Sequence, residues 1–221
     1  MMCRLVKSLT IAMSLSCMQA ALASDESSLK RVKFKIENQL NQKQPELGTQ
    51  VPEEIKFYVG DNKAQAFARD IFKPDSTVLV FVMSGAFTPT CTGKHLSGVA
   101  AKIDALKKYV DTVAVVTRDS IDVVNAWLNA APSGRGAEIL GISDFTANFM
   151  DFLGILHKPQ VQGALFSNHR LGVFPKRTVA IVKNGALVYM EVEEPGACLL
   201  TEAETVLGLL EKEPSLQKAK L

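Results

Sequence analysis

Apolar and polar positions alternate along this chain in a pattern that predicts a sheet with helices packed on it. Residues 78–83 are six consecutive apolar residues, which is typical of a strand buried on both faces. A second buried strand is predicted at residues 112–117. Between them, apolar positions 96, 99, 100, 103 and 106 share one face of a helix that is predicted to begin near Cys91. Strand, helix and strand together predict a right-handed βαβ unit with parallel strands, so Cys91 should lie at the carboxyl end of the first strand.

The later half of the chain predicts an antiparallel hairpin. Residues 177–182 and 187–192 are apolar runs on either side of the Asn-Gly pair 184–185, and both residues of such a pair accept the positive φ angles of a tight turn. A capping box at residues 201–204 predicts the start of a last helix. The other predicted elements are a strand at 55–59, helices at 121–131 and 146–153, a short strand at 138–141 and an irregular segment at 154–175. This order by itself indicates an α/β fold.

One thiol occupies a special place in this pattern. Cys91 follows a turn and begins a predicted helix, where free N–H groups and the helix dipole stabilise a thiolate relative to a thiol. The thiolate is the nucleophilic form of cysteine. Thr88 can turn its hydroxyl toward the sulfur and an incoming oxygen, and Pro89 stiffens the approach. These residue types suit attack on an electrophilic oxygen or sulfur better than metal binding.

The segment GAFTPTCTGKHL, residues 85–96, closely resembles the active-site signature of the peroxiredoxins, and in particular of their type II subfamily. The resemblance covers residues 45–212, although Ser84 stands where the subfamily usually has proline. It implies a thioredoxin-like fold, with a central mixed sheet flanked by helices. It also implies an antioxidant thiol peroxidase without a bound cofactor, which reduces hydrogen peroxide and alkyl hydroperoxides while Cys91 is oxidised to a sulfenic acid.

The same resemblance implies roles for further residues. Arg177 matches an arginine that holds the thiolate in type II members, although Thr178 replaces the aromatic residue that usually follows it. His95 matches a histidine found in many members, and a supporting role in positioning the loop is implied for it. Gly85 and Phe87 belong to the signature itself and are expected to support the site in the same way.

Simpler interpretations stay open for several of these residues. Trp127, the only tryptophan, lies in a VVNAW segment that resembles one in type II members, but it fits a core position as well as a place lining the site. A metal pair formed by Cys91 and His95 is a rival interpretation. It would need more ligands than the chain offers at suitable spacing, since only His157 and His169 remain and no C-x-x-C motif is present.

Cys198 bears on how an oxidised Cys91 is reduced. An animal branch of the family carries a resolving cysteine close to this place, slightly shifted along the chain. Two routes therefore follow from the resemblance. Either Cys198 forms a disulfide with Cys91 that a thioredoxin-like donor reduces, or glutathione or a glutaredoxin-like protein reduces the sulfenic acid while Cys198 stays passive. A purely structural disulfide between the two cysteines is a third interpretation.

Two other functional classes fit a thioredoxin-like domain. A disulfide oxidoreductase would be natural in an exported protein, but it needs C-x-x-C, and Cys91 is followed by Thr92, Gly93 and Lys94. A non-catalytic binding module would use the polar N-terminal segment and would consume no peroxide. Loss of peroxide consumption would therefore distinguish the module from an enzyme.

Residues 1–23 differ from the rest of the chain. Arg4 and Lys7 precede a moderately apolar run that ends in a small-x-small site, which predicts a signal peptide for export to the periplasm or into the secretory pathway. An organelle transit peptide is the alternative, and lipidation of Cys17 is a weaker one. The run is too polar and too short to remain as a membrane span.

Composition bounds the remaining choices. The 221 residues are 47% hydrophobic and 22% charged, which fits one globular domain with appendages. Cleavage after Ala23 removes two of 25 basic residues, so that 23 face 23 acidic ones, and it leaves Cys91 and Cys198 of the four cysteines. Neither a nucleic-acid nor a membrane partner is expected, and family habit predicts a monomer or homodimer. The predicted parts are a leader at 1–23, a polar tether at 24–44, the peroxiredoxin-like domain at 45–213 and a tail at 214–221.

Overall fold

The fold is seen in a computed structural model that describes residues 43–60, 64–156, 174–194 and 196–219. These residues belong to one compact unit, Gln42–Leu221. The predicted leader, nearly all of the predicted tether and most of the irregular segment, with His157 and His169, lie outside the described residues. Among the helices that are described, none is long and apolar enough to cross a membrane.

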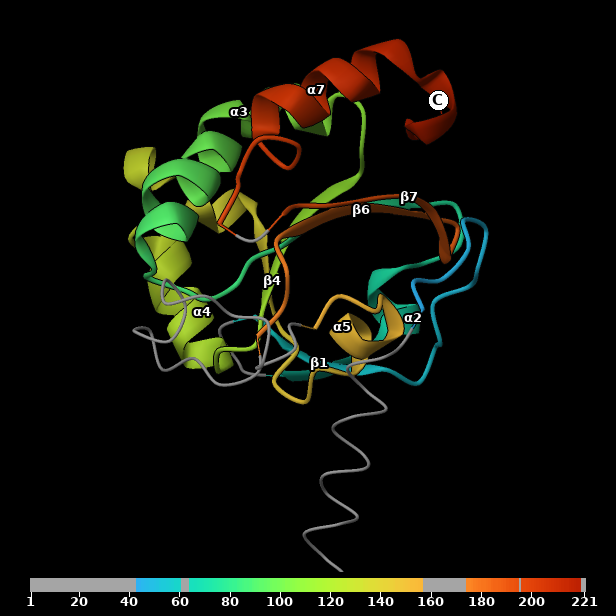
Figure 1. Ribbon diagram of the computed structural model, residues 1–221, viewed down its shortest axis with the longest axis horizontal. Helices are drawn as coiled ribbons and strands as arrows, with labels where there is room; N and C mark the ends of the chain where they lie inside the picture. Colours follow the sequence, from blue (N-terminus) through green and yellow to red (C-terminus); the bar gives the residue numbers. More distant parts are fainter. Residues whose placement is uncertain (1–42, 61–63, 157–173, 195, 220–221) are drawn as a thin grey trace, which may run out of the picture. The chain divides into compact units, whose positions relative to one another are not determined.

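Seven strands form one mixed sheet in the order β2-β1-β5-β4-β3-β6-β7. Figure 1 labels β1, β4, β6 and β7 of this sheet. The central pairs β3–β4 and β4–β5 are parallel, and the other neighbours are antiparallel. All six residues of β3 are buried, which explains its unbroken apolar run. The predicted parallel unit and mixed sheet are therefore confirmed. The strands are β1 Lys56–Val59, β2 Ala64–Phe67, β3 Thr77–Val82, β4 Thr112–Thr117, β5 Leu140–Ser143, β6 Thr178–Lys183 and β7 Ala186–Val192.

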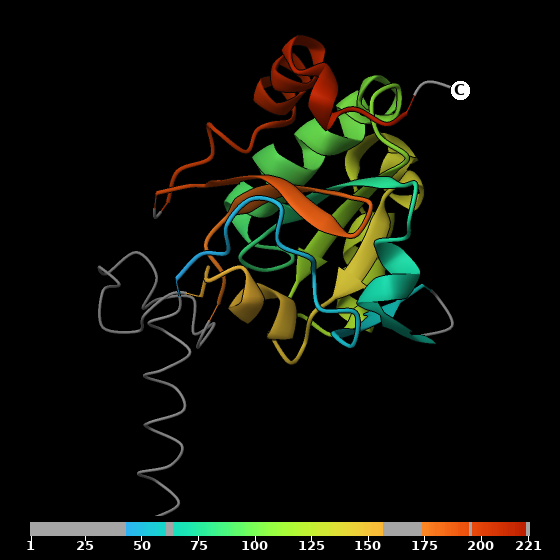
Figure 2. The ribbon, with the colours of Figure 1, turned by 90° about the vertical axis from the view of Figure 1, so that its right-hand side faces the viewer.

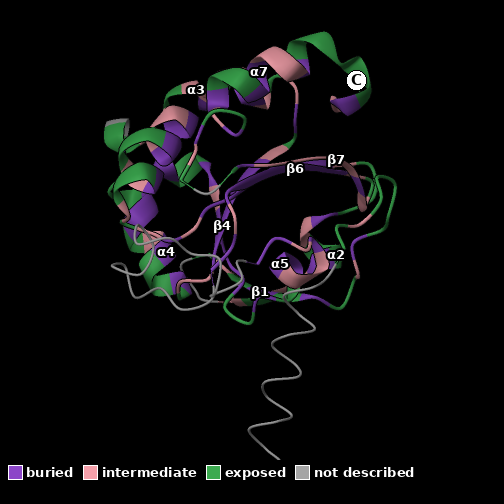
Figure 3. Cartoon of the chain, in the orientation of Figure 1, coloured by how far each residue is buried: buried purple, intermediate pink, exposed green. Residues whose placement is uncertain are grey.

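Helices cover both faces of the sheet. Apolar side chains of α3, α4 and α7 share one core cluster with β3, β4 and β6, while α2 and α5 lie on the opposite face (Figures 1 and 2). The buried sides of α3 and α7 face this core (Figure 3). The helical segments are α2 Ala68–Ile71, η1 Cys91–Leu96, α3 Ser97–Lys107, α4 Ile121–Asn129, η2 Pro132–Glu138, α5 Asn148–Phe152, α7 Ala203–Lys212 and η4 Pro214–Leu216.

The predicted hairpin is confirmed in detail. Strands β6 and β7 pair antiparallel, and the turn between them places Asn184 at a φ of 54° and Gly185 at a φ of 77°. Both angles lie in the left-handed region that an Asn-Gly pair tolerates best. The hairpin matters for the site because β6 also pairs with β3, so the start of β6 lies beside the end of β3.

Three elements differ from the sequence prediction. Strand β2 and the short helix α2 were not predicted, since β2 is an edge strand of partly exposed residues with no clear alternation. The strand predicted at residues 138–141 begins only at Leu140, because η2 occupies the residues before it as a 3-10 helix that starts at a proline.

The predicted capping box at Thr201 is wrong. Helix α7 begins after Glu202, and no side chain caps it. The Thr201 hydroxyl instead donates to the carboxylate of Glu193, 3.2 Å away, in the loop that follows β7. The Thr201 hydroxyl therefore donates its hydrogen bond to the carboxylate of Glu193, although the local sequence pattern had assigned this hydroxyl to capping the helix.

Candidate active site

Cys91 lies in the first turn of the helix that follows the central strand. The loop after β3 leads into Pro89, whose fixed φ and missing N–H suit the first position of a helix. The Thr92 N–H donates to the Thr88 carbonyl oxygen at 2.9 Å and closes the first turn. The η1 segment that starts at Cys91 is π-helical, a form that is frequent at functional sites. The thiol is 1% exposed, at the helix N-terminus where the sequence pattern placed it.

The loop before the helix is held in a strained shape. Phe87 has a φ of 56°, which is costly for a bulky residue, and its side chain is exposed. The Ala86 N–H donates to the Asp119 carboxylate at 2.7 Å. The Thr88 hydroxyl, which we expected to turn toward the sulfur, donates to the Gly85 carbonyl oxygen at 2.9 Å. Asp119 and Thr88 thus fix the backbone that delivers Cys91.

Arg177 reaches the thiol from a neighbouring strand. Val82 at the end of β3 is paired with Thr178 at the start of β6, so Arg177 lies beside the loop after β3. Its Nη1 donates to the Cys91 sulfur at 3.2 Å, and its Nε donates to the Ala197 carbonyl oxygen at 3.1 Å. The guanidinium is buried, with 8% of the residue exposed. The structure therefore brings together Cys91 and the arginine that the resemblance singled out.

His95 shares the same guanidinium nitrogen. Nη1 of Arg177 lies 3.2 Å from His95 Nδ1, and His95 Nε2 lies 2.9 Å from the Thr201 carbonyl oxygen. A guanidinium only donates and a carbonyl only accepts, so Nδ1 must be unprotonated and Nε2 must carry the proton. Burial, followed by the charge of Arg177, lowers the pKa of His95 to about 3. His95 is therefore a neutral imidazole with one defined tautomer.

Cys198 belongs to the segment after β7, which is hydrogen-bonded to Arg177 and Lys94. Lys94 donates to the Cys198 carbonyl oxygen at 2.8 Å and forms an ion pair with Glu202 at 2.5 Å. Cys198 and Cys91 are both buried free thiols. Burial raises the pKa of the Cys198 thiol despite the opposing effect of Arg177. The segment that carries Cys198 is thus bound by Lys94 at the Cys198 carbonyl oxygen and by Arg177 at the Ala197 carbonyl oxygen.

Trp127 serves the core and borders the site at once. The residue is fully buried on α4, as its core interpretation expected. Its indole N–H donates to the Thr92 hydroxyl at 2.9 Å, and its ring lies 6.5 Å from the ring of Phe87. The core interpretation of Trp127 is therefore confirmed, and the side chain also contacts two residues close to Cys91 in the chain.

Three residues at the site were missed in the sequence: Lys94, Asp119 and Glu193. Asp119 follows β4, and the rule that α/β sheets build sites at the carboxyl ends of parallel strands points to it. Lys94 lies on the same helix as Cys91, but its partners are more than a hundred residues further along the chain. For Glu193 the sequence holds no signal, because its role depends on how one loop folds back.

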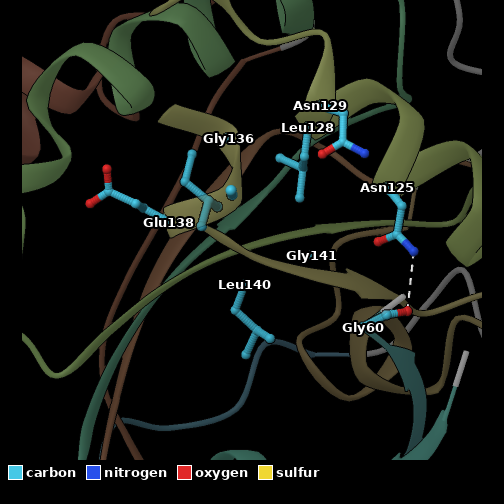
Figure 4. A pocket seen from close by; sticks show the side chains of 10 residues that line it. Gly60, Asn125, Leu128, Asn129, Gly136, Glu138, Leu140 and Gly141 are labelled. Atoms are coloured by element: carbon cyan, nitrogen blue, oxygen red, sulfur yellow. Dashed lines mark hydrogen bonds between the residues drawn. The ribbon is translucent and has the colours of Figure 1, made fainter. Parts of the chain in front are cut away.

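A cavity of about 390 Å³ lies away from these residues, between α4, η2 and β5 (Figure 4). Asn125 on its wall donates to the Gly60 carbonyl oxygen at 3.1 Å. Glu138, also on the wall, is engaged by Arg135 and Lys107. Its polar groups are thus largely used within the protein, and none of the residues around Cys91 lines it.

Comparisons with known proteins bear on the site that holds Cys91. A family model described as Redoxin matches residues 46–207. The hybrid peroxiredoxin hyPrx5 of Haemophilus influenzae is 30% identical over 177 residues, which cover 78% of this chain and 69% of that protein. Peroxiredoxin-2C of Oryza sativa subsp. japonica is 26% identical over 166 residues, which cover 74% of this chain and 97% of that protein.

Solved structures agree with these relatives. The crystal structure of reduced Prx3 from Vibrio vulnificus in complex with hydrogen peroxide is 29% identical, covers 76% of this chain and 96% of that one, and superposes with a TM-score of 0.65. The family match includes Cys91, Arg177 and the sheet that brings them together. The chain therefore belongs to the redoxin family and is a peroxiredoxin, a thiol-dependent peroxidase of the thioredoxin-like superfamily.

Proposed function

We propose that Cys91 is the peroxidatic cysteine of this chain and that Arg177 is the residue that stabilises charge at it. The observation that carries this proposal is the contact of 3.2 Å between Arg177 Nη1 and the Cys91 sulfur. A buried guanidinium beside a thiol at a helix N-terminus favours negative charge on the sulfur. The same positive charge would stabilise the negative charge that develops on a departing oxygen.

The reaction needs no bound cofactor. The Cys91 thiolate attacks the distal oxygen of a hydroperoxide, so that an S–O bond forms while the O–O bond breaks. The sulfur is oxidised to a sulfenic acid, and the leaving oxygen takes a proton from water and departs as water or an alcohol. Hydrogen peroxide and small alkyl hydroperoxides are the proposed substrates, and the complex of the Vibrio vulnificus relative with hydrogen peroxide supports this choice.

The other signature residues shape the site. Gly85, Phe87 and Pro89 set the path of the loop into the helix, and His95 holds one nitrogen of Arg177. The Thr88 hydroxyl donates its hydrogen bond to the Gly85 carbonyl oxygen, so the lone pairs of the hydroxyl oxygen can accept a hydrogen bond from the O–H of an incoming peroxide.

A thiol donor then reduces the sulfenic acid. If Cys198 resolves, its thiol attacks the sulfenic sulfur, a disulfide with Cys91 forms and water leaves, and a thioredoxin-like donor reduces the disulfide. A disulfide needs Cα atoms within roughly 7 Å of each other, so this route involves local unwinding of the first turn after Cys91. It also involves release of the segment that Lys94 and Arg177 bind. Otherwise glutathione or a glutaredoxin-like donor attacks the sulfenic acid directly.

Intact mass separates these routes. We would replace Cys3 and Cys17 by serine, add one equivalent of hydrogen peroxide without reductant, and repeat this with Cys198→Ser. Loss of two hydrogens in the first chain and gain of oxygen in the second would identify Cys198 as the resolving cysteine. Gain of oxygen in both would indicate an external thiol. An unchanged mass in both, or full turnover by Cys91→Ser, would refute the proposed function.

We further propose that residues 1–23 export the protein, with organelle import as the alternative. Among the relatives, two peroxiredoxins are named chloroplastic and one mitochondrial, which supports the organelle-import alternative. Fusing residues 1–30 to a fluorescent reporter tests this proposal. Mature protein beginning at Ser24 in an exported fraction supports export, and a reporter that stays uncleaved at its site of synthesis contradicts both routes.

A further inference from the structure

Glu193 is a buried carboxylate that the mechanism above does not use. It directly follows β7 and is 4% exposed. Its Oε1 accepts three hydrogen bonds, from the Leu199 N–H at 2.6 Å, the Thr201 N–H at 2.9 Å and the Thr201 hydroxyl at 3.2 Å. A buried carboxylate is costly unless its oxygens are well satisfied, so its position depends on the loop that folds over it.

These bonds continue to the reactive thiol. Thr201, whose N–H and hydroxyl bind Glu193, accepts the Nε2–H of His95 with its carbonyl oxygen. His95 in turn accepts Nη1–H of Arg177, and the same nitrogen donates to Cys91. The Glu193 N–H donates to the Arg177 carbonyl oxygen at 2.9 Å. Glu193, Thr201, His95 and Arg177 thus form a closed ring of hydrogen bonds with Cys91 attached to it.

The tautomer of His95 is the sensitive point in this ring. As long as the Thr201 carbonyl accepts from Nε2, the imidazole proton stays on Nε2 and Nδ1 is free to accept from Arg177. If Thr201 moves, the proton can occupy Nδ1. That N–H would then face an N–H of Arg177, two donors would oppose each other, and the guanidinium would be pushed away from the sulfur.

We propose that Glu193 is a positioning residue for the peroxidase reaction, acting through Thr201 and His95 to hold Arg177 against Cys91. This inference rests on the proposed function of Cys91 and Arg177. It adds a residue that touches neither the thiol nor the peroxide, yet controls the geometry of the charge beside them.

The test compares Glu193→Ala and Glu193→Gln with Glu194→Gln, a control at the next residue, whose side chain is exposed. The first measurement is the rate constant of Cys91 oxidation by hydrogen peroxide in a single turnover. We expect Glu193→Ala to lose roughly tenfold to a hundredfold, as misplacement from a distant change can cost. Glu193→Gln keeps an acceptor oxygen at the same place and should recover most of the rate, while Glu194→Gln matches the parent.

The second measurement reports on the ring and not on general stability. Nitrogen-15 NMR of His95 should show the Nε2–H tautomer in the parent and in Glu193→Gln, and a mixed tautomer in Glu193→Ala. If Glu193→Ala does not fold, Glu193→Asp is the second variant, because its carboxylate is one methylene further from Thr201. Its oxidation rate should fall and its His95 tautomer should become mixed, each to a smaller degree than expected for Glu193→Ala. An unchanged rate and tautomer in the folded variant would overturn the inference. An unchanged rate of Cys91 oxidation in Arg177→Ala would instead overturn the proposed function of Arg177, on which this inference rests.

Discussion

At Arg177 a single side chain serves the sulfur of Cys91, the ring of His95 and the Ala197 carbonyl oxygen. A planar guanidinium holds its N–H groups on separate nitrogens of a rigid fork, so Nη1 serves the sulfur and the imidazole while Nε serves the carbonyl oxygen. An ammonium group at this place would keep the positive charge and lose the geometry. Substitutions at Arg177 can therefore separate the contribution of positive charge to the peroxidase rate from the contribution of hydrogen-bond orientation.

For this reason Arg177→Lys should keep part of the peroxidase rate. We expect about a hundredfold loss of the rate constant with hydrogen peroxide for Arg177→Ala, the cost of removing one charge-stabilising donor, and a smaller loss for Arg177→Lys. Stopped-flow fluorescence of Trp127 measures the rate. Arg135→Lys is the matched control, because Arg135 binds Asp104 and Glu138 away from the thiol. Equal rates for Arg177→Lys and the parent would show that orientation is unimportant.

His95 and Asp144 are buried groups whose shifted pKa values should change the free energy of unfolding with pH in opposite directions. The pKa of His95 is about 3, below its usual 6.5, so its contribution is complete above pH 6.5 and is lost as pH falls toward 3. Burial raises the pKa of Asp144 from 3.8 to about 7, so its contribution is complete below pH 3.8 and is lost as pH rises through 7. Between pH 3.8 and 6.5 the two effects oppose each other.

Replacing either His95 or Asp144 should leave the pH dependence of stability that the other residue causes. In His95→Gln the free energy of unfolding should fall as pH rises over this range, and in Asp144→Asn it should rise, each by up to about 1.4 kcal/mol per pH unit. Urea unfolding at several pH values measures both slopes. The parent, in which the two groups oppose each other, should have a slope between those of the variants. Slopes of the same sign in both variants would contradict these pKa directions.

At the scale of elements, the site is assembled where the ends of several segments meet. The end of β3 supplies the loop to Cys91, the end of β4 supplies Asp119, the start of β6 supplies Arg177, and the segment after β7 supplies Ala197 and Cys198. Parallel β3 and β4 end at the same edge, and antiparallel β6 begins there. The topology alone therefore brings these parts of the chain together.

Lys94 joins two of these elements and should control how easily the Cys198 segment opens. Its ammonium binds the Cys198 carbonyl oxygen and Glu202, while half of its side chain remains exposed. Lys94→Met should therefore speed disulfide formation between Cys198 and Cys91 only by roughly twofold to threefold, as befits a solvent-screened pair. Quenched samples analysed by mass give this rate.

Lys102→Met is the matched control for that measurement. Lys102 also links α3 to the start of α7, through Glu204 at 2.6 Å, but within the described residues this ion pair does not involve the Cys198 segment. Its disulfide rate should equal that of the parent. A slower disulfide rate in Lys94→Met would mean that Lys94 guides Cys198 toward Cys91 instead of restraining it.

At the scale of the whole molecule, local signals in the sequence predicted most of the fold. The buried strands, the helix after Cys91 and the Asn-Gly hairpin each follow from a pattern within a few residues, and each is confirmed. Strand β2 was missed because an edge strand needs no apolar alternation. Thr201 was misassigned because its hydroxyl binds Glu193, a contact that no local pattern encodes.

The site was predictable to a smaller extent, because its contacts join residues far apart in the chain. Arg177 lies 86 positions after Cys91, and only the resemblance to a known family pointed to it. Asp119, Lys94 and Glu193 act through hydrogen bonds to backbone groups, which depend on the folded path and not on the identity of the partner residue.

The segment after α7 packs against the rest of the domain. Leu216 in η4 is buried in the core cluster, although the sequence assigned residues 214–221 to a tail. Gln217 donates to the Leu210 carbonyl oxygen at 2.6 Å, and the Lys218 N–H donates to the Tyr109 carbonyl oxygen at 2.7 Å. These bonds hold the segment against α7 and the end of α3, the helix that directly follows η1 with Cys91 and His95.

Leu216→Ala should therefore lower stability without slowing the reaction with peroxide. We expect the free energy of unfolding to fall by about 2 to 3 kcal/mol, the usual cost of a cavity left by a buried leucine, while Leu47→Ala, at an exposed leucine, changes it by less than about 0.5 kcal/mol. Urea unfolding and single-turnover oxidation of Cys91 on the same samples measure both. A slower oxidation in folded Leu216→Ala would show that packing at the C-terminal end is transmitted along α7 to the ring around His95. In that case the position of Arg177 would depend on the packing of α7 as well as on the hydrogen bonds of Glu193 and Thr201.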